Sequence, residues 1–467
     1  MRYEDLSASA IDSAKRFWFD SLGCALGGSA THDSRILVDH HRSLAGGATG
    51  ACSVFATGWR TNPVDAAFLN SHMVRAMDFN DIYWKADPAH PSDLICGPLA
   101  LCEMHDRSGR DLILATVIVH ELQCRFGEIG RPGIREYGWH HATLSGFTAA
   151  VGAGRVIGLT PEQVVNAIGI CASRTGTLGA VTAGDLTMMK NTVDPWASRM
   201  GVESAMLAAR GFTGPAHIID GKEGLFHAMG HAQARGARCA FDAEGLTRDP
   251  PTSPADAYRI DACGMKSFPV EALMHSPLSA LFRVRDRHGV AVEDIAEIRV
   301  EVVARAADIL GDPAKYRPTT RETADHSLPY AMAVALVDGA LGPAQFDEDR
   351  VRDPRLAPIM DRVRVVANES YEARFPASQP SRVTVVLRDG RAHSEEVDYP
   401  KGDPRDPMVW TEIDAKFRGL ARDVLDGEGC DAIARLVRGL DGMESVRPLC
   451  EAMASCADAA GLVGAAR

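Results

Sequence analysis

A change in the spacing of apolar residues along this chain limits what it can fold into. Residues 298–302 alternate between apolar and charged side chains, which is the pattern of a strand with one buried face. Residues 383–387 alternate in the same way, and Asp389-Gly390 then predicts a hairpin turn before a returning strand near residues 395–399. We therefore expect a sheet in this part of the chain.

The rest of the chain has the spacing and the start signals of helices. Asn62 before Pro63 predicts the start of a helix that runs up to Asp78. Patterns of the capping-box type at Ser108 and Thr160 predict two further starts. Other helical patterns occupy residues 112–119, 144–157, 196–210, 276–287 and 326–337, and helices resume at residue 411.

These patterns predict a mainly α fold, in which a large all-helical domain accompanies a smaller α+β domain. The helical domain is expected at residues 1–258 and the α+β domain at residues 259–400, while residues 401–467 complete the helical domain. A chain of 467 residues is also too long for one ordinary core, so length alone favours more than one domain.

Composition excludes several classes of function. The formal net charge of -12 argues against a nucleic-acid partner, because phosphate contacts need clustered Lys and Arg. The longest mainly apolar run, residues 112–119, is too short to span a bilayer, and the chain opens without a signal-peptide pattern. We expect a soluble cytoplasmic protein that does not bind membranes. The 11 cysteines form no Cys-x-x-Cys, which favours buried, reduced thiols.

The sequence predicts no cofactor and no metal ion. Gly152-Ala153-Gly154 resembles a dinucleotide-binding loop, but its spacing is wrong and it lies inside a helical pattern. Neither a Walker A loop nor a His-Glu-x-x-His or Gly-x-Ser-x-Gly motif occurs. Nucleotide-driven chemistry and serine hydrolysis therefore have no support.

One short stretch, residues 77–94, combines four aspartates, a histidine and three large aromatic residues, which a solvated loop rarely needs together. Asp78 and Asp81 are three residues apart, so the end of a helix would place both near one face. Either acid could instead cap a helix, and His90 before Pro91 could be an ordinary loop histidine.

Similar groups recur at other predicted helix starts. His140 and His141 precede one helix, and Lys190 precedes another that carries Asp194 and Arg199 near its start. The α+β region adds Lys266, Glu271, His275, Asp325, His326 and Tyr330. Simpler alternatives are that one of His140 and His141 is buried and the other exposed, and that Lys190 only snorkels to solvent. The stretch from Asp325 to Ser327 could likewise be a helix cap alone. Together, however, these groups suit a polycarboxylate substrate: cations hold its carboxylates while an Asp, Glu or His removes an adjacent proton.

The order of these motifs resembles the MmgE/PrpD family over nearly the whole chain. The motifs are Met-Asp-Phe-Asn-Asp from Met77, His-Pro-Ser-Asp from His90, Lys-x-Phe-Pro-x-Glu from Lys266 and Ala-Asp-His-Ser-Leu-x-Tyr from Ala324. That family includes 2-methylcitrate dehydratases, cis-aconitate decarboxylases and iminodisuccinate epimerases. The resemblance implies a helical domain with an α+β lid, often a homodimer, and no metal or iron–sulfur centre.

The resemblance also implies roles for individual residues. The expected catalytic residues are Asp78, His90, His140 and Glu271, and the expected substrate-binding residues are Asp81, Tyr83, His141, Lys190, Arg199, Lys266, His275 and Tyr330. The base that takes the proton is left open among Asp78, His140 and Glu271, and His90 is expected to protonate the departing hydroxyl. Because these residues come from both predicted domains, we expect the domains to close over the substrate.

The chain departs from the family pattern at several positions. Ile82 stands where the family often has a threonine, and the residues after Lys190 differ from the usual run. Glu271 stands where the decarboxylase branch has a histidine, which favours the dehydratase branch. The sequence therefore predicts a cofactor-independent hydro-lyase, similar to 2-methylcitrate dehydratase, that acts on a citrate-like polycarboxylate as a homodimer. A decarboxylase or epimerase of the same family, or an inactive metabolite-binding paralogue, is the alternative.

Overall fold

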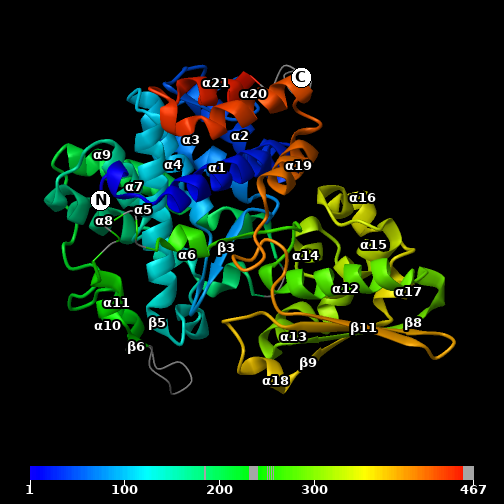
Figure 1. Cartoon of the computed structure of the whole chain (residues 1–467). Helices are drawn as coiled ribbons and strands as arrows, with labels where there is room; N and C mark the ends of the chain where they lie inside the picture. The colour runs from blue at the N-terminus through cyan, green and yellow to red at the C-terminus, as the bar shows by residue number, and fades with distance from the viewer. Residues whose placement is uncertain are drawn as a thin grey trace. The chain divides into compact units, whose positions relative to one another are not determined.

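The computed structural model describes residues 1–183, 186–230, 240–249, 251, 253, 255 and 257–455. The chain divides into two compact units. Unit 1 comprises Met1–Gly184, Met188–Cys263 and Val409–Arg467, and unit 2 comprises Asp185–Thr187 and Gly264–Met408. The prediction of a mainly helical chain is confirmed (Figure 1).

Unit 1 consists of helices and a few short strands. Its helices are α1 (Ala8–Ser29), α2 (His32–Ala45), α3 (Pro63–Arg75), α4 (Cys96–Met104), α5 (Gly109–Glu128), α6 (Ala142–Ser145), α7 (Ala149–Val156), α8 (Pro161–Ala172), α9 (Val193–Ala209), α10 (Leu225–Gly230), α11 (Ala243–Thr247), α19 (Trp410–Ala421), α20 (Gly427–Arg438) and α21 (Arg447–Ser455). Its strands are β1 (Cys52–Ser53), β2 (Arg60–Thr61), β3 (Asp81–Trp84), β4 (Pro88–Ala89), β5 (Gly130–Arg131) and β6 (Ala240–Phe241). Helix α3 is buried along most of its length and packs against α1, α4 and α9.

The predicted helix starts are confirmed at α3, α5 and α8. The side chain of Asn62 caps α3 and Pro63 occupies its first turn. Ser108 caps α5 in a reciprocal box with Asp111, and Thr160 caps α8 in the same way. Each cap satisfies a backbone N–H that has no partner inside its helix, which is why these starts could be identified locally.

The single helix predicted at residues 144–157 is wrong, because this stretch forms α6 and α7 with a break between them. At the break, Gly146 packs so closely that a Cβ there would lie 1.7 Å from the Thr175 hydroxyl oxygen. The Thr148 hydroxyl donates to Gln123 and to the carbonyl of Ser145. This side-chain bonding competes with continuous helical hydrogen bonds, and a sequence pattern does not reveal it.

Unit 2 is built on a four-stranded sheet of order β11-β10-β8-β9. The strands are β8 (Ile295–Val302), β9 (Val363–Ala367), β10 (Ser381–Leu387) and β11 (Ala392–Val397), and β7 (Gly264–Met265) opens the unit. The helices are α12 (His275–His288), α13 (Ala304–Leu310), α14 (Arg321–Ala324), α15 (Leu328–Asp338), α16 (Glu348–Val351), α17 (Ala357–Met360) and α18 (Glu369–Glu372). The predicted hairpin is confirmed, since β10 and β11 pair antiparallel across Asp389-Gly390.

Helix α12 packs against strands β10 and β11. In the register of the sheet, Val383 pairs with Val300 and Val385 with Ile298, so the alternating apolar residues share one buried face. Helix α15 begins at Leu328, two residues later than predicted, because the Ser327 side chain caps it.

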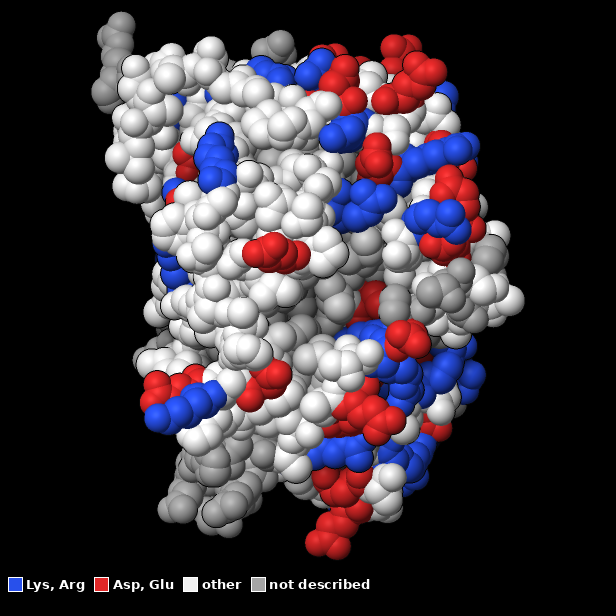
Figure 2. All heavy atoms as spheres, turned by 90° about the vertical axis from the view of Figure 1, so that its left-hand side faces the viewer, with Lys and Arg blue, Asp and Glu red and all other residues white. Residues whose placement is uncertain are grey.

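The surface of unit 1 near α8 and α9 carries several exposed apolar side chains. These are Val165, Leu178, Met188, Met189, Trp196 and Phe212. Figure 2 views the molecule from the side on which Figure 1 places α8 and α9, and much of this face shows few charged side chains. Exposed apolar groups that gather in this way are typical of an interaction surface. Among the described residues, no helix is both long enough and apolar enough to cross a bilayer.

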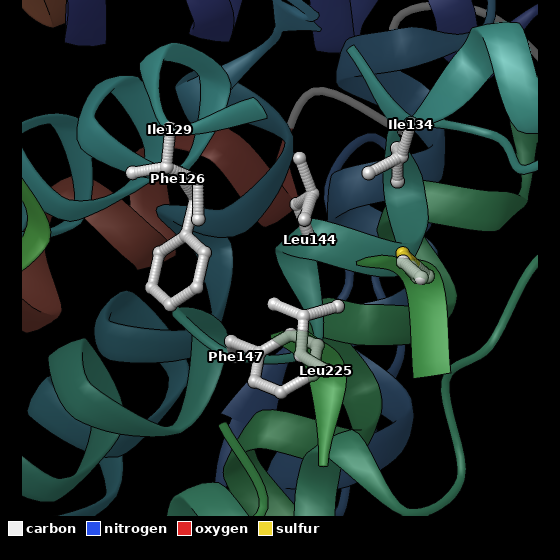
Figure 3. Close-up of a cluster of buried hydrophobic side chains, with 7 residues drawn as sticks. Phe126, Ile129, Ile134, Leu144, Phe147 and Leu225 are labelled. Carbon is white, nitrogen blue, oxygen red and sulfur yellow. The ribbon is translucent and has the colours of Figure 1, made fainter. Parts of the chain in front are cut away.

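A compact apolar cluster forms where the end of α5 meets α6 and α10. Figure 3 shows its side chains converging; they are Phe126, Ile129, Ile134, Leu144, Phe147, Leu225 and Met229. The cluster fixes the backbone around Ile134, whose N–H donates to the Asp87 carboxylate at 2.8 Å. The Arg135 N–H donates to the same carboxylate at 3.3 Å. Asp87 thus anchors the stretch of residues 77–94 to this core.

Candidate active site

Helix α3 delivers the chain into the acidic stretch through a sharp turn. The helix ends at Arg75, so the prediction that it runs to Asp78 is wrong. Asp78 has φ of +48°, a left-handed conformation that only a few non-glycine residues adopt. Asp81 lies in β3 instead. The idea that Asp78 and Asp81 share one face of a helix end is therefore also wrong, because this turn separates them.

The Asp78 carboxylate lies between two buried cations. One oxygen is 2.8 Å from Nη1 of Arg75, and the other is 3.2 Å from Nζ of Lys190. Lys190 comes from the short helix η5 (Met188–Asn191) and is buried. The alternative that Lys190 snorkels to solvent is therefore wrong. Strain at Asp78 and buried charge at one point are features that often mark functional sites.

Asp93 lies on the other side of Arg75. Its carboxylate is 3.7 Å from Nε of Arg75 and accepts a hydrogen bond from the Asn80 side chain at 2.8 Å. Burial raises the pKa of Asp93 well above its usual range, which Arg75 only partly opposes. Arg75 and Lys190 thus bring two basic side chains to the carboxylate of Asp78.

Asp81 is a hydrogen-bonding centre of the acidic stretch. Its carboxylate accepts the Ser92 backbone N–H at 3.0 Å and the Ser92 hydroxyl at 2.6 Å. These bonds hold the start of the short helix η2 (Pro91–Leu94). Nε2 of His120, from α5, lies 3.5 Å from the same carboxylate. Asp81 therefore organises the loop rather than the end of α3.

The carbonyl of Asp81 determines how His90 is protonated. Nδ1 of His90 lies 2.7 Å from this carbonyl oxygen, which can only accept a hydrogen bond. Nδ1 therefore carries the hydrogen, and the neutral ring has its lone pair on Nε2. His90 lies in the loop between β4 and η2 and is buried there.

His140 has the opposite arrangement. Its Nδ1 accepts the backbone N–H of Ala142 at 3.2 Å, so the neutral ring carries its hydrogen on Nε2. Burial lowers the pKa of His140 well below the usual range, and the neighbouring His141 adds to this effect. His140 is therefore neutral at physiological pH and is a hydrogen-bond donor through Nε2.

His141 connects the two rings. It lies 3.9 Å from the His140 ring and 5.4 Å from the His90 ring, measured between centroids. Both His140 and His141 are buried, so the alternative of one buried and one exposed histidine is wrong. Ring contacts and hydrogen bonds thus link the three histidines to Asp81. From Asp81 the network continues through Ser92, Asn80 and Asp93. It then reaches Arg75, Asp78 and Lys190.

Asp194, at the start of α9, supports the histidine pair. One oxygen accepts the hydroxyl of Ser145, and the other is 3.4 Å from Nε2 of His141. Burial raises the pKa of Asp194, but His141 more than offsets this and holds it below the usual range. His140, His141 and Asp194 also offer ligand atoms within 4.8 Å of one another, so this trio could hold a metal ion.

Two predicted substrate-binding residues of unit 1 are bonded elsewhere. The Tyr83 hydroxyl donates to Glu128, which also pairs with Arg259. Nη1 of Arg199 is 2.7 Å from Asp65 on α3. Neither of these two bonds joins the Asp78 and histidine groups. A role in binding substrate therefore remains a prediction for both.

Four of the predicted site residues belong to unit 2. Nζ of Lys266 donates to the carbonyl of Val270 at 3.0 Å, and the Glu271 side chain caps the short helix η8 (Ala272–Met274). His275 begins α12, with its ring near Phe268. The Tyr330 hydroxyl donates to the carbonyl of Gln345. These four side chains are at least partly buried, and their roles stay predictions.

Sequence reasoning missed His120 as a neighbour of Asp81 and Arg75 as the ion-pair partner of Asp78. His120 is a single histidine within the apolar helix α5, and no local signal sets it apart. Arg75 lies three residues before Asp78, and this spacing beside an acidic stretch was a usable signal of an ion pair.

Comparison with known proteins identifies the family of this chain. Residues 1–236 match the family model of the MmgE/PrpD N-terminal domain, and residues 268–441 match that of the MmgE/PrpD C-terminal domain. A cis-aconitate decarboxylase from Aspergillus terreus is 26% identical over 471 residues, covering 96% of this chain and 92% of the relative. The cis-aconitate decarboxylase of Homo sapiens is 24% identical over 462 residues, covering 94% of this chain and 89% of the relative. A 2-methylcitrate dehydratase from Cupriavidus necator is 26% identical over 431 residues, covering 86% of this chain and 84% of the relative. The resemblance found in the sequence motifs is confirmed, and the chain belongs to the MmgE/PrpD family.

Proposed function

We propose that the protein is a cofactor-independent lyase that removes water from a citrate-like di- or tricarboxylate. The observation that carries this proposal is the pair of buried histidines with opposite tautomers, His90 and His140, in one network with Arg75 and Lys190. The relatives named 2-methylcitrate dehydratase and cis-aconitate decarboxylase support a substrate of this class.

His90 is the acid–base residue in this proposal. Its Nε2 lone pair takes the proton from the carbon next to a substrate carboxylate, and the electron pair left on that carbon forms the double bond. As the bond from the neighbouring carbon to the hydroxyl breaks, His90 returns the proton to the oxygen, and water leaves. The histidine ends the cycle in its starting form. The hydrogen bond from Nδ1 to the Asp81 carbonyl supports this role because it fixes the tautomer throughout.

His140 stabilises the negative charge that develops on the substrate carboxylate when the proton leaves. A neutral imidazole is a poor acid but a good hydrogen-bond donor, and burial keeps His140 neutral. Lys190 and Arg75 bring positive charge to the same region, and Asp78 holds both in place. Lys266, Glu271, His275 and Tyr330 are proposed to complete substrate binding on the basis of the family motifs.

Removal of the positive charge at Lys190 should weaken substrate binding. Lys190→Met keeps the length of the stem but loses a charge-assisted hydrogen bond, which corresponds to about 10- to 100-fold in affinity. Calorimetry with citrate checks this result. Lys85→Met is the matched control, because Lys85 lies in the same acidic stretch but is exposed. Equal affinity in both variants would show that Lys190 does not bind the substrate.

A turnover assay on a panel of carboxylates tests the proposed function. The panel contains citrate, 2-methylcitrate and cis-aconitate, and ultraviolet absorbance reports a new conjugated double bond while released carbon dioxide reports decarboxylation. We expect a dehydration product, unchanged by prolonged chelation. Loss of activity on chelation, with recovery on adding Zn²⁺, would instead assign the trio His140, His141 and Asp194 to a metal ion. Binding without turnover would indicate an inactive paralogue, and carbon dioxide release would indicate a decarboxylase.

We also propose that a second copy of the chain covers the apolar surface near α8 and α9. Trp196, 45% exposed on α9, is the largest apolar side chain there. Light scattering should give a mass of twice 50.1 kDa for the native protein. Trp196→Glu should shift the mass toward the monomer, because a buried unpaired charge opposes association. Leu44→Glu on α2, also at an exposed apolar position, should leave the mass unchanged. A native protein that is monomeric would reject the proposal.

A further inference from the structure

Helix α6 is a single turn of 4 residues that directly follows His140 and His141. The carbonyl of His140 accepts the backbone N–H of Thr143 at 3.0 Å, and that of His141 accepts the N–H of Leu144 at 2.8 Å. The backbone of both histidines thus continues into α6. A single turn is not stable by itself, so bonds to other elements must fix where α6 and the two histidines lie.

Ser145, the last residue of α6, belongs to a chain of hydrogen-bonded side chains. Its hydroxyl donates to Oδ1 of Asp194 on α9, and its oxygen accepts the side-chain N–H of Gln123 on α5 at 2.8 Å. Oε1 of Gln123 in turn accepts the hydroxyl of Thr148. No more than 1% of any of these four residues is exposed. The chain therefore joins α5, α6 and α9 in the interior of unit 1.

Asp194 fixes the direction of these hydrogen bonds. Burial raises the pKa of Asp194, but His141 more than offsets this and holds the pKa below the usual range. The carboxylate is therefore ionised at neutral pH and only accepts hydrogen bonds. The Ser145 hydroxyl must give its hydrogen to Asp194, which leaves its lone pairs for the NH₂ group of Gln123. One orientation of the Gln123 amide then satisfies every member of the chain.

Other contacts of α6 are less specific or reach less rigid parts of the molecule. Leu144 packs in the apolar cluster of Figure 3, and such a contact has no preferred direction. The Thr143 hydroxyl bonds the backbone of Thr177, which lies in the irregular segment after α8. The Ser145 chain, in contrast, ties α6 to α5 and α9, two long helices. It is therefore well placed to set the orientation of α6.

We propose that Gln123 and Ser145 are positioning residues for His140 and His141. They hold α6 and the Asp194 carboxylate, whose second oxygen lies 3.4 Å from Nε2 of His141. A displacement of about 1 Å at a group that contacts the substrate can cost about 100-fold in rate, so the placement of His140 matters. This role in catalysis rests on the proposed function, although the hydrogen-bond chain does not.

The position of the two histidines can be measured without any assay of activity, by nuclear magnetic resonance of protein labelled with ¹³C in the histidine rings. The ring centroids of His140 and His141 are 3.9 Å apart, so each ring shifts the resonances of the other. We expect these resonances to move or broaden in Ser145→Ala and in Gln123→Met, because the two variants break the chain at different residues. Unchanged resonances in both variants would overturn the proposal, whatever reaction the protein catalyses.

Kinetics of the same variants test the link to catalysis. Each should lower kcat about 10- to 100-fold with little change in KM, because Lys190 and Arg75, the proposed carboxylate contacts, stay in place. Since both substitutions interrupt one chain, the double variant should be about as slow as the slower single variant. Losses in kcat that multiply in the double variant would show that Gln123 and Ser145 act separately, and the proposal would fail.

Thr116→Val is the control for these variants. Thr116 lies on the same helix as Gln123, is completely buried, and accepts the indole N–H of Trp18 at 2.8 Å. Its loss should lower Tm and leave kcat and both sets of histidine resonances unchanged. If Ser145→Ala and Gln123→Met also lower Tm but keep the native kcat, their role is only structural and the proposal is wrong. Absence of turnover in the native protein would reject the proposed function instead, and the resonances would still decide whether the chain holds the histidines.

Discussion

Replacing Lys416 by methionine should lower the free energy of unfolding by about 3–5 kcal/mol, because it leaves a buried carboxylate without its partner. Nζ of Lys416 lies 2.6 Å from Oδ1 of Asp20 and donates to the carbonyl of Phe79 at 2.6 Å. Only 6% of the Lys416 side chain and 1% of the Asp20 side chain are exposed. Methionine matches the stem of lysine, so the loss reports the charge. Denaturant titration measures it.

The pH dependence of this loss follows from Asp20. Burial raises the pKa of Asp20, and Lys416 opposes that rise. Without Lys416 the folded-state pKa moves further above the value of about 3.9 in an unfolded chain. The folded variant then binds the proton more tightly than the unfolded chain does, so acidification favours folding relative to neutral pH. The destabilisation should be full at neutral pH and shrink as pH falls through the raised pKa.

Lys15→Met provides the matched control. Nζ of Lys15 also lies 2.6 Å from a carboxylate, that of Asp441, but 41% of that side chain is exposed. Water screens this pair, so the cost should be about 1 kcal/mol or less. Asp20→Asn in the Lys416→Met background should recover part of the lost stability. A Lys416→Met variant as stable as Lys15→Met would show that the buried pair contributes no more than a surface pair.

Much of the secondary structure could be predicted from local chemistry. The caps at Asn62, Ser108 and Thr160 act on backbone groups within a few residues, so the short-range pattern is sufficient. The hairpin at Asp389-Gly390 is local for the same reason. The failures at the end of α3 and between α6 and α7 come from contacts with distant residues. Gly146 against Thr175 is one, and the Asp78 carboxylate against Lys190, 112 residues away in sequence, is another.

In the candidate site, too, local sequence patterns identified individual residues but not their distant partners. His90 and Lys190 could be named because their motifs are contiguous, and both prove to be buried in one hydrogen-bonded network. The groups that fix their geometry could not be named in this way. Lys416 bonds a carbonyl 337 residues away in sequence, and His120 reaches Asp81 from the middle of an apolar helix. Only the fold brings these partners together, and they carry no pattern of their own.

His90→Asn should lower kcat about 10²- to 10⁴-fold while the protein remains folded, which is the usual effect of losing a positioned acid–base group. Asparagine can place its amide nitrogen near Nδ1 of the imidazole, so the hydrogen bond to the Asp81 carbonyl, 2.7 Å in the native protein, can be kept. What is lost is Nε2, the atom proposed to take and return the proton. KM should change little, because the proposed carboxylate contacts lie at Lys190 and Arg75.

The same variant tests whether His90 only holds the loop. His105→Asn is the control, because it replaces the same side chain in the same way at an exposed position just after α4. We expect it to match the native enzyme in both kcat and Tm. A purely structural His90 predicts the reverse for His90→Asn: a kcat close to native with a lower Tm. The acid limb of the native pH–rate profile gives a further criterion, because protonation of Nε2 removes the base. That limb should disappear in His90→Asn, and its persistence would assign the proton transfer to another residue of the network.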